Sequence, residues 1–287
     1  QQILTPVPVS LVSGNYSKVD LAELMNDSRD VKRAPGAAYQ RDDIKFTQAS
    51  YTCTERGLEE VLDQRDMATF AYTGLEFAQL AADRALSGVM RHLEKESVDL
   101  LQSESTFTSP TTVSTEWSTP ASCTPIDDVL AGVEAMRAKG GLKPNVVAMS
   151  GKIFRNLQKC AQIIDRIKYS GLDDPKSVTL QALAALFQVE EVILFDEMRN
   201  SAGKGLAASL TDLWDDEYVG LYKVARTGDP RECGVGRTFT FTGDGGGVVI
   251  EQYYEPRVRG DVVRARVDLA PTIVHPEAGH LLKNITA

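Results

Sequence analysis

The sequence predicts an α+β protein in which extended and β-rich segments at both ends of the chain surround a helical and αβ middle. Three observations predict this class. Apolar residues recur at helical spacing from about Asp66 to Glu96. Helix and strand patterns alternate from Ile126, and the C-terminal part alternates apolar and polar side chains as strands do. At 287 residues the chain is near the length at which one core divides, so we expect two domains or one elaborate domain with extensions.

Composition and charge narrow the classes of function. Hydrophobic residues make up 43% of the chain and charged residues 25%, which is ordinary for a folded protein. The net charge of −9 argues against a basic nucleic-acid binder, because neutralising phosphates needs a surplus of Lys and Arg. An acidic chain is still suited to enclosing DNA, since a container should not adhere strongly to its contents. No apolar run approaches the roughly 18 to 20 residues that span a bilayer, so we expect no membrane partner.

The first segments of the chain are typical of extensions without a core of their own. Residues 1–35 carry no sustained period, and two prolines open an extended stretch, which predicts an arm that packs on another surface. Residues 36–57 alternate loosely, with Ile44 and Phe46 as the clearest apolar positions. This segment is polar for a core hairpin, so it predicts a projecting two-stranded loop that is supported from outside.

A single long helix is predicted next. From about Asp66 to Glu96 it would be near 45 Å long at ~1.5 Å per residue, several times the usual ~11 to 12 residues. Such a helix suggests an elongated architectural element. Gaps of three and four place one set of apolar residues on a common face: Ala71, Leu75, Ala78, Ala82, Leu86, Val89 and Leu93.

The following residues 103–125 are crowded with Ser and Thr, which permits a linker, but their Thr, Val, Phe and Trp content favours a strand that ends in a loop around Trp117.

An αβ pattern follows, with clear start and stop signals. Asp127 and Asp128 suit the first turn of a helix, and Gly140 and Gly141 end it. Ser150 is placed to cap the next helix. The predicted elements are helix 126–140, strand 145–150, helix 151–167, helix 178–188 and strand 189–197.

The end of the chain is predicted to be β-rich. Residues 237–256 contain the Gly-rich GDGGG and predict two strands around a hairpin turn. Residues 258–274 alternate: Val263, Ala265, Val267 and Leu269 face one way, and Arg264, Arg266 and Asp268 face the other. One face of this strand is therefore expected to be packed and the other to be exposed or in contact with a partner.

Motifs that could carry chemistry are weak. MRNSAGKG around Lys204 fails a phosphate-binding loop at two of four positions, because Met198 replaces a Gly and Gly205 replaces a Ser or Thr. His275 and His280 are five residues apart, with a Pro and a Gly between them, unlike the helical pair of a zinc protease. Neighbouring carboxylates are frequent by chance in a chain with 40 acidic residues. We therefore expect no enzyme activity, no metal and no cofactor.

The four cysteines, Cys53, Cys123, Cys160 and Cys233, form no C-x-x-C pair, and reduced, partly buried thiols are the expected state.

Three stretches and the order of elements resemble a known family. In residues 117–169 a Trp and a Pro precede an I-D-D-V helix, a Pro-Asn enters a strand ending in Met-Ser, and an F-x-x-L helix follows with Phe154 and Leu157. Residues 180–194 and 258–285 carry the likeness further. Together they resemble the major capsid protein of tailed phages, whose HK97-like fold is shared with encapsulins.

The resemblance implies an HK97-like capsid fold with five parts. These are an N-terminal arm at 1–35, an extended β-hairpin loop at 36–65, the long spine helix with the first part of the peripheral domain at 66–124, the axial domain at 125–235 and the C-terminal part of the peripheral domain at 236–287.

The resemblance also implies a function. Many copies would self-assemble into hexamers and pentamers of an icosahedral virus head that encloses double-stranded DNA without sequence-specific binding. Portal and scaffold proteins are implied partners, decoration proteins stay open, and the location would be the virion, assembled in the host cytoplasm. Candidate contacts between subunits are Arg41, Lys45, Phe46, Arg257, Arg259, Arg264 and Arg266.

Alternatives stay open for these residues and for the function. The arginines near the last strands would pair with acidic patches on neighbours, or they are ordinary surface charge. Some relatives form a lysine–asparagine crosslink, but the sequence identifies no asparagine or acid to act with Lys45. An encapsulin-like nanocompartment shell is the alternative function. A soluble αβ enzyme with a helical insertion is a second alternative, and it lacks a catalytic set.

Overall fold

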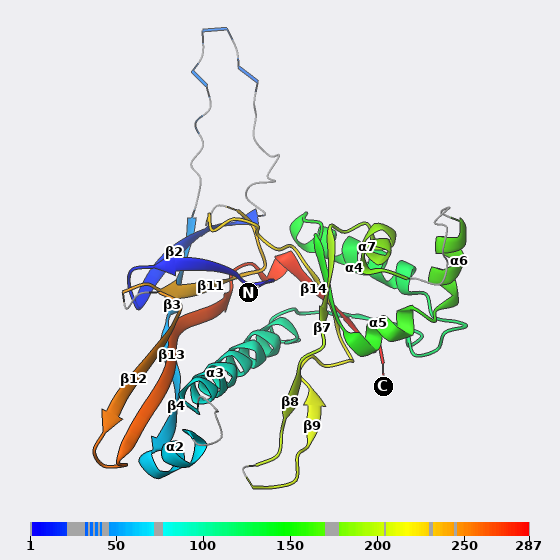
Figure 1. Cartoon of the computed structure of the whole chain (residues 1–287). Coiled ribbons are helices and arrows are strands. Elements are labelled where there is room, and N and C mark those ends of the chain that lie inside the picture. The colour runs from blue at the N-terminus through cyan, green and yellow to red at the C-terminus, as the bar shows by residue number, and fades with distance from the viewer. Residues whose placement is uncertain are drawn as a thin grey trace.

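The computed structural model describes residues 2–21, 32–33, 35–36, 38–39, 41, 46–71, 77–169, 178–203, 205–229, 232–243 and 246–286. Two lobes, each built on a five-stranded sheet, make up the body of the molecule (Figure 1). One hairpin extends from it, and a further pair of strands packs against the sheet of the first lobe. No helix among the described residues has the length and apolar character that a bilayer span requires.

The sheet of the first lobe has the order β1-β11-β13-β12, and β4 also pairs with β13. The β1–β11 pair is parallel and the other pairs are antiparallel. We call this sheet the peripheral sheet. Its strands are β1 (Thr5–Val9), β4 (Thr54–Asp63), β11 (Gly236–Phe241), β12 (Val248–Glu255) and β13 (Gly260–Ile273).

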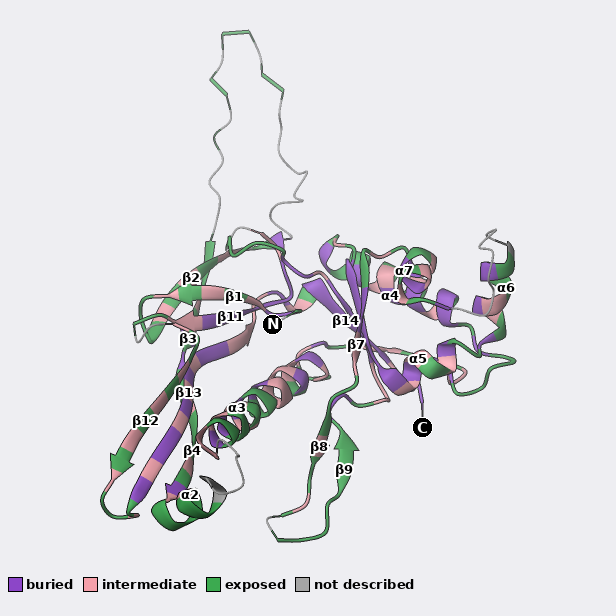
Figure 2. Cartoon of the chain, in the orientation of Figure 1, coloured by how far each residue is buried: buried purple, intermediate pink, exposed green. Residues whose placement is uncertain are grey.

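The alternation predicted for β13 is confirmed. Val263, Ala265, Val267 and Leu269 are buried, and the intervening side chains from Arg264 to Asp268 are partly exposed (Figure 2). Helix α3 (Phe77–Leu101) covers the buried face with an apolar stripe of its own. The strand is therefore packed on one side and available to solvent on the other.

The hairpin predicted for residues 237–256 is wrong. Strands β11 and β12 do not pair with each other; both pair with β13, which is long enough to accept them in succession. The tight turn instead joins β12 to β13, and Arg259 adopts a left-handed φ of 49° within it. Gly260 follows, where a Cβ would lie 2.0 Å from the Leu62 carbonyl oxygen, so only glycine fits. A period of two identifies strands but does not specify their partners.

The single helix predicted from Asp66 to Glu96 is also revised. The structure has α2 (Gln64–Ala71) and α3, which is 25 residues long and continues to Leu101. At ~1.5 Å per residue α3 spans about 37 Å. Residues 72–76, with the predicted Leu75, lie outside the described residues.

The buried stripe of α3 is centred one position from the predicted face. Its fully buried members are Ala81, Ala85, Val89, Leu93, Val98 and Leu101. The predicted Ala78, Ala82 and Leu86 are partly buried beside it. An apolar stripe wider than 100° does not fix its own centre, and the contact with β13 decides it.

The second lobe contains a sheet of order β5-β14-β10-β6-β7, which we call the axial sheet. Its strands are β5 (Thr111–Thr112), β6 (Val146–Ser150), β7 (Glu191–Phe195), β10 (Val219–Tyr222) and β14 (Gly279–Lys283). Around it lie α4 (Pro125–Gly140), α5 (Gly151–Leu157), α6 (Ala161–Tyr169), α7 (Leu180–Phe187) and a short 3-10 helix, η1 (Pro276–Ala278).

The start and stop signals predicted for the helices of this lobe are confirmed at α4 and α5. Helix α4 starts at Pro125 and ends before Gly141, whose φ of 64° is left-handed. The Ser150 hydroxyl accepts a hydrogen bond from the Ile153 N–H at 3.3 Å and caps α5. The helix predicted over 151–167 is two helices, α5 and α6, with a turn at 158–160 between them.

Residues 103–125 contain the predicted strand followed by a loop around Trp117, although the strand, β5, is only two residues long, and the Trp117 side chain is fully buried. One long-range feature of this lobe differs from the sequence predictions. Strand β14 pairs with β10 and β5, so the last strand lies outside the peripheral sheet to which residues 236–287 were assigned. Leu281 and Leu282 explain this, because both side chains are buried in the axial lobe.

The strand pair that packs on the peripheral sheet is β2 (Ser13–Val19) with β3 (Phe46–Thr52), and the extending hairpin is β8 (Met198–Asn200) with β9 (Leu210–Asp212). Strand β3 therefore pairs with the predicted arm, and the division at residue 35, which falls between the paired strands, stays a prediction.

Candidate functional site

The face of the peripheral sheet that points away from α3 carries a row of paired charges. On β13 the Arg264 Nε lies 2.7 Å from Glu59 Oε1 of β4, and its Nη2 lies 3.1 Å from the Tyr253 hydroxyl of β12. Arg266 Nη2 lies 3.0 Å from Glu251 Oε1. Exposed pairs of this kind add little to the stability of a fold, because solvent screens them. Both arginines thus have carboxylate partners within their own chain.

The other predicted contact residues lie elsewhere. Arg257 and Arg259 are exposed in the turn between β12 and β13, at the tip of that hairpin. Arg41 is exposed, and Phe46, at the start of β3, is 59% exposed. Lys45 lies outside the described residues. The structure therefore gathers four of the arginines on one hairpin and places Arg41 and Phe46 on a separate segment.

The β8–β9 hairpin is a feature that the sequence did not identify. It extends from the body beside α3 (Figure 1). Met198, Leu206 and Leu210 are 47%, 73% and 64% exposed. The only sign of this hairpin in the sequence is the presence of leucines in an otherwise Gly- and Ala-rich stretch. Large apolar side chains on a projecting hairpin are typical of a surface that contacts another chain.

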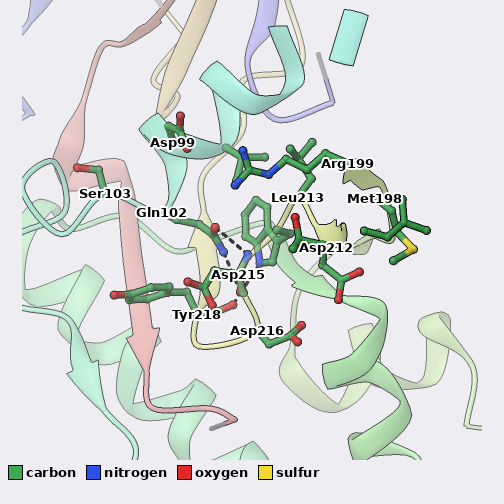
Figure 3. A pocket seen from close by; sticks show the side chains of 14 residues that line it. Asp99, Gln102, Ser103, Met198, Arg199, Asp212, Leu213, Asp215, Asp216 and Tyr218 are labelled. Carbon is green, nitrogen blue, oxygen red and sulfur yellow. Dashed lines mark hydrogen bonds between the residues drawn. The ribbon is translucent and has the colours of Figure 1, made fainter. Parts of the chain in front are cut away.

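A polar pocket of about 620 Å³ lies at the base of this hairpin, against the C-terminal end of α3 (Figure 3). Gln102 donates to the Asp215 carbonyl and accepts from the Asp215 N–H, both at 3.0 Å. Asp216 pairs with Lys152 at 3.1 Å. The Gln102 contacts hold the hairpin base beside the end of α3, and the Lys152 pair joins it to α5. The lining also includes Asp99 and Asp212.

The two C-terminal histidines are buried parts of the core. His280 is 1% exposed, and its Nε2 lies 2.8 Å from the Thr111 hydroxyl oxygen. Burial, followed by the nearby charge of Lys139, lowers the pKa of His280 to about 4. Burial also lowers the pKa of His275. Within the described ranges no three His, Cys, Asp or Glu side chains are grouped as metal ligands.

The buried His280 predicts an acid-sensitive fold. The unfolded chain takes up this proton near pH 6.5 and the folded chain only near pH 4, so stability is lost as the pH falls through this window. Between pH 7 and pH 4.5 we expect His280 to remove about 2 kcal/mol from the free energy of unfolding. Urea unfolding of wild type and His280→Gln at both values checks this. Equal losses in the two proteins would exclude His280 as the cause.

The chain is similar in sequence to a known phage protein. No family model matches the chain. The chain is 26% identical over 244 residues to the major capsid protein of Burkholderia phage BcepMu, a match that covers 80% of this chain and 73% of that protein.

Solved structures match over nearly the whole chain. A phage-related protein from Bordetella bronchiseptica superposes with a TM-score of 0.70 at 21% identity, covering 99% of this chain and 91% of that one. The mature capsid of bacteriophage PhiM1 gives 0.56 at 14%, covering 97% and 84%. An encapsulin complex from Synechococcus elongatus gives 0.54 at 12%, covering 99% and 86%. At these identities the likeness shows a shared fold.

Proposed function

We infer that this chain, which has the HK97-like fold, is the major capsid protein of a tailed double-stranded DNA phage. Many copies self-assemble into the hexamers and pentamers of an icosahedral head. The observation that carries this inference is the 26% identity to a phage major capsid protein over 80% of the chain. The fold match to a phage capsid over 97% of the chain supports it.

The shape and surface of the subunit suit this function. A closed shell reuses one set of surfaces in every copy, so its subunit needs several separate contact areas. The β8–β9 hairpin extends from the body and exposes Leu206, and Phe46 is exposed at the start of β3. Projecting elements of this kind gain support when they lie across neighbouring copies.

The remaining parts of the proposal follow from this function. The head would enclose DNA without sequence-specific contacts, in keeping with the net charge of −9. Portal and scaffold proteins would be partners in assembly, and whether decoration proteins also bind stays an open question. The subunits would assemble in the host cytoplasm and become part of the virion. The subunit would act as a structural protein without catalytic activity. Residues 1–35, 36–65, 66–124, 125–235 and 236–287 stay our proposed arm, loop, spine, axial and C-terminal peripheral parts, except that strand β14 of the last part pairs within the axial sheet.

The contents of the particle separate this function from an encapsulin-like compartment. Particles isolated from cells that carry the natural gene cluster are treated with nuclease, and the protected contents are then extracted. We expect double-stranded DNA of uniform length. A packaged enzyme without protected DNA would support the compartment instead.

Among the predicted contact residues, we propose that Arg257 and Arg259 contact a neighbouring subunit. Arg264 and Arg266 are weaker candidates, because both have partners in their own chain. Replacing Arg257 by Gln is expected to raise the protein concentration needed for assembly roughly two- to fivefold, because one contact of about 0.5 to 1 kcal/mol is lost per subunit. Light scattering during assembly measures this. Arg264→Gln is the matched control, with near-normal assembly expected. A larger effect of Arg264→Gln than of the Arg257 substitution would show that subunits meet at the exposed face of the peripheral sheet instead.

A further inference from the structure

We propose that Cys123 and Cys160 form a disulfide-forming pair that locks the axial lobe when the protein meets an oxidising environment. Their sulfur atoms lie 2.7 Å apart, and a bond would bring them to about 2.05 Å. Cys123 lies two residues before the start of α4, and Cys160 directly precedes α6. The two cysteines are 37 positions apart in the sequence, and a bond between them would therefore join the starts of two helices.

The backbone around the pair is already held in place from both sides. The Ala161 N–H donates to the Pro120 carbonyl at 3.0 Å. The Gln162 side chain accepts from the Ile126 N–H at 3.1 Å and donates to Asp127 at 2.8 Å. These bonds link the same two helix starts without the cysteines. Closing the disulfide thus requires a small movement of two side chains and leaves the helices where they are.

The pair also has a route to a small oxidant. Cys123 and Cys160 are 3% and 0% exposed, but each lies next to exposed residues, at 118–122 and at 158–159. Opening of either turn would uncover a thiol. Burial, followed by the hydrogen bond to Cys160, raises the pKa of Cys123 well above its ordinary value, which keeps the thiol protonated at neutral pH and makes the reaction slow.

The chemistry balances with hydrogen peroxide as the oxidant. One thiolate attacks the peroxide, an S–O bond forms, the O–O bond breaks, and hydroxide leaves and takes up a proton as water. The second thiolate then attacks this sulfenic sulfur, so that the S–S bond forms, the S–O bond breaks and a second water leaves. Two thiols are oxidised and one peroxide is reduced.

The timing of this bond rests on the proposed function. Disulfides are rare in a reducing cytoplasm and persist on virions and in extracellular surroundings. The subunit would therefore fold and assemble with free thiols and become crosslinked within each copy after release. A bond inside the subunit preserves the contacts between copies.

The crosslink is measured by peptide mass spectrometry. The purified protein is treated with hydrogen peroxide well below its unfolding temperature, alkylated under denaturing conditions and digested with trypsin. We expect the peptide that contains Cys123 to be linked to the one that begins at Cys160. Cys53 and Cys233 should remain open to alkylation. A digest in which Cys123 and Cys160 are alkylated, or oxidised without being linked, would overturn the proposal.

Thermal unfolding provides a second readout. Oxidised wild type should unfold roughly 5 to 10 °C above the reduced protein, because the bond restricts the unfolded chain. Cys53→Ser should keep this shift, and Cys123→Ser and Cys160→Ser should lose it. Running both measurements on unassembled and assembled protein separates the two claims. A crosslink without particles would count against the capsid function, and particles without a crosslink would count against this inference.

Discussion

Replacing Trp117 by alanine is expected to lower the free energy of unfolding by about 4 kcal/mol. The indole is fully buried in the axial core, and its Nε1 donates to Asp128 Oδ2 at 2.9 Å. The substitution leaves a cavity between the turn that precedes α4 and the axial sheet. It also removes a hydrogen bond from a carboxyl whose pKa is raised by burial.

Denaturant unfolding of the dissociated subunit, followed by circular dichroism and by the fluorescence of Trp214, measures this effect. Trp117→Phe is the matched control. It keeps an aromatic ring and loses the N–H donor, so we expect a loss of about 1 to 2 kcal/mol. A Trp117→Ala protein within 1 kcal/mol of wild type would show that the indole does not support this core.

Replacing Arg237 by alanine is expected to destabilise the protein by about 3 kcal/mol and to open residues 226–234. The Arg237 side chain enters this segment from the start of β11 and is 4% exposed as a residue. Its guanidinium donates to the Thr227 carbonyl, to the Asp229 carbonyl at 2.8 Å and to the Glu232 carbonyl at 3.0 Å. Without it, three carbonyl groups lose their donor together.

The charge of Arg237 also acts on Glu232. Burial alone would raise the pKa of Glu232, but hydrogen bonds from the Thr227 hydroxyl and from the Arg226 and Thr227 N–H groups, together with the Arg237 charge, hold it at about 2. Hydrogen exchange and limited proteolysis of this segment measure the opening. Arg237→Lys keeps the positive charge but loses the planar guanidinium with its several N–H donors, so we expect protection from exchange between that of wild type and of Arg237→Ala. Unchanged protection in Arg237→Ala would contradict the role.

Features that depend on nearby residues could be predicted from the sequence. Helix α4 was predicted from two acidic residues in its first turn and a terminal glycine pair, and its ends are as predicted to within a residue. The Ser150 cap depends on a serine and an N–H three residues later. The alternation of β13 depends on its own side chains. Each of these signals lies within one element.

Features that depend on distant partners could not be predicted in the same way. β11 and β12 were predicted as a hairpin, yet their partner is a third strand that comes later in the chain. Trp117 lies in a Ser- and Thr-rich stretch, and its burial follows from packing against the axial lobe. Among the candidate contacts, Arg264 meets Glu59, 205 positions away, so its in-chain partner was invisible to local patterns.

The central claim is that one chain builds a closed shell, and the size of the purified protein tests it most directly. Sedimentation velocity and negative-stain electron microscopy of the full chain, under conditions that favour assembly, should show five- and sixfold rings or closed icosahedral particles. A stable monomer or small dimer across the same concentrations would contradict the claim.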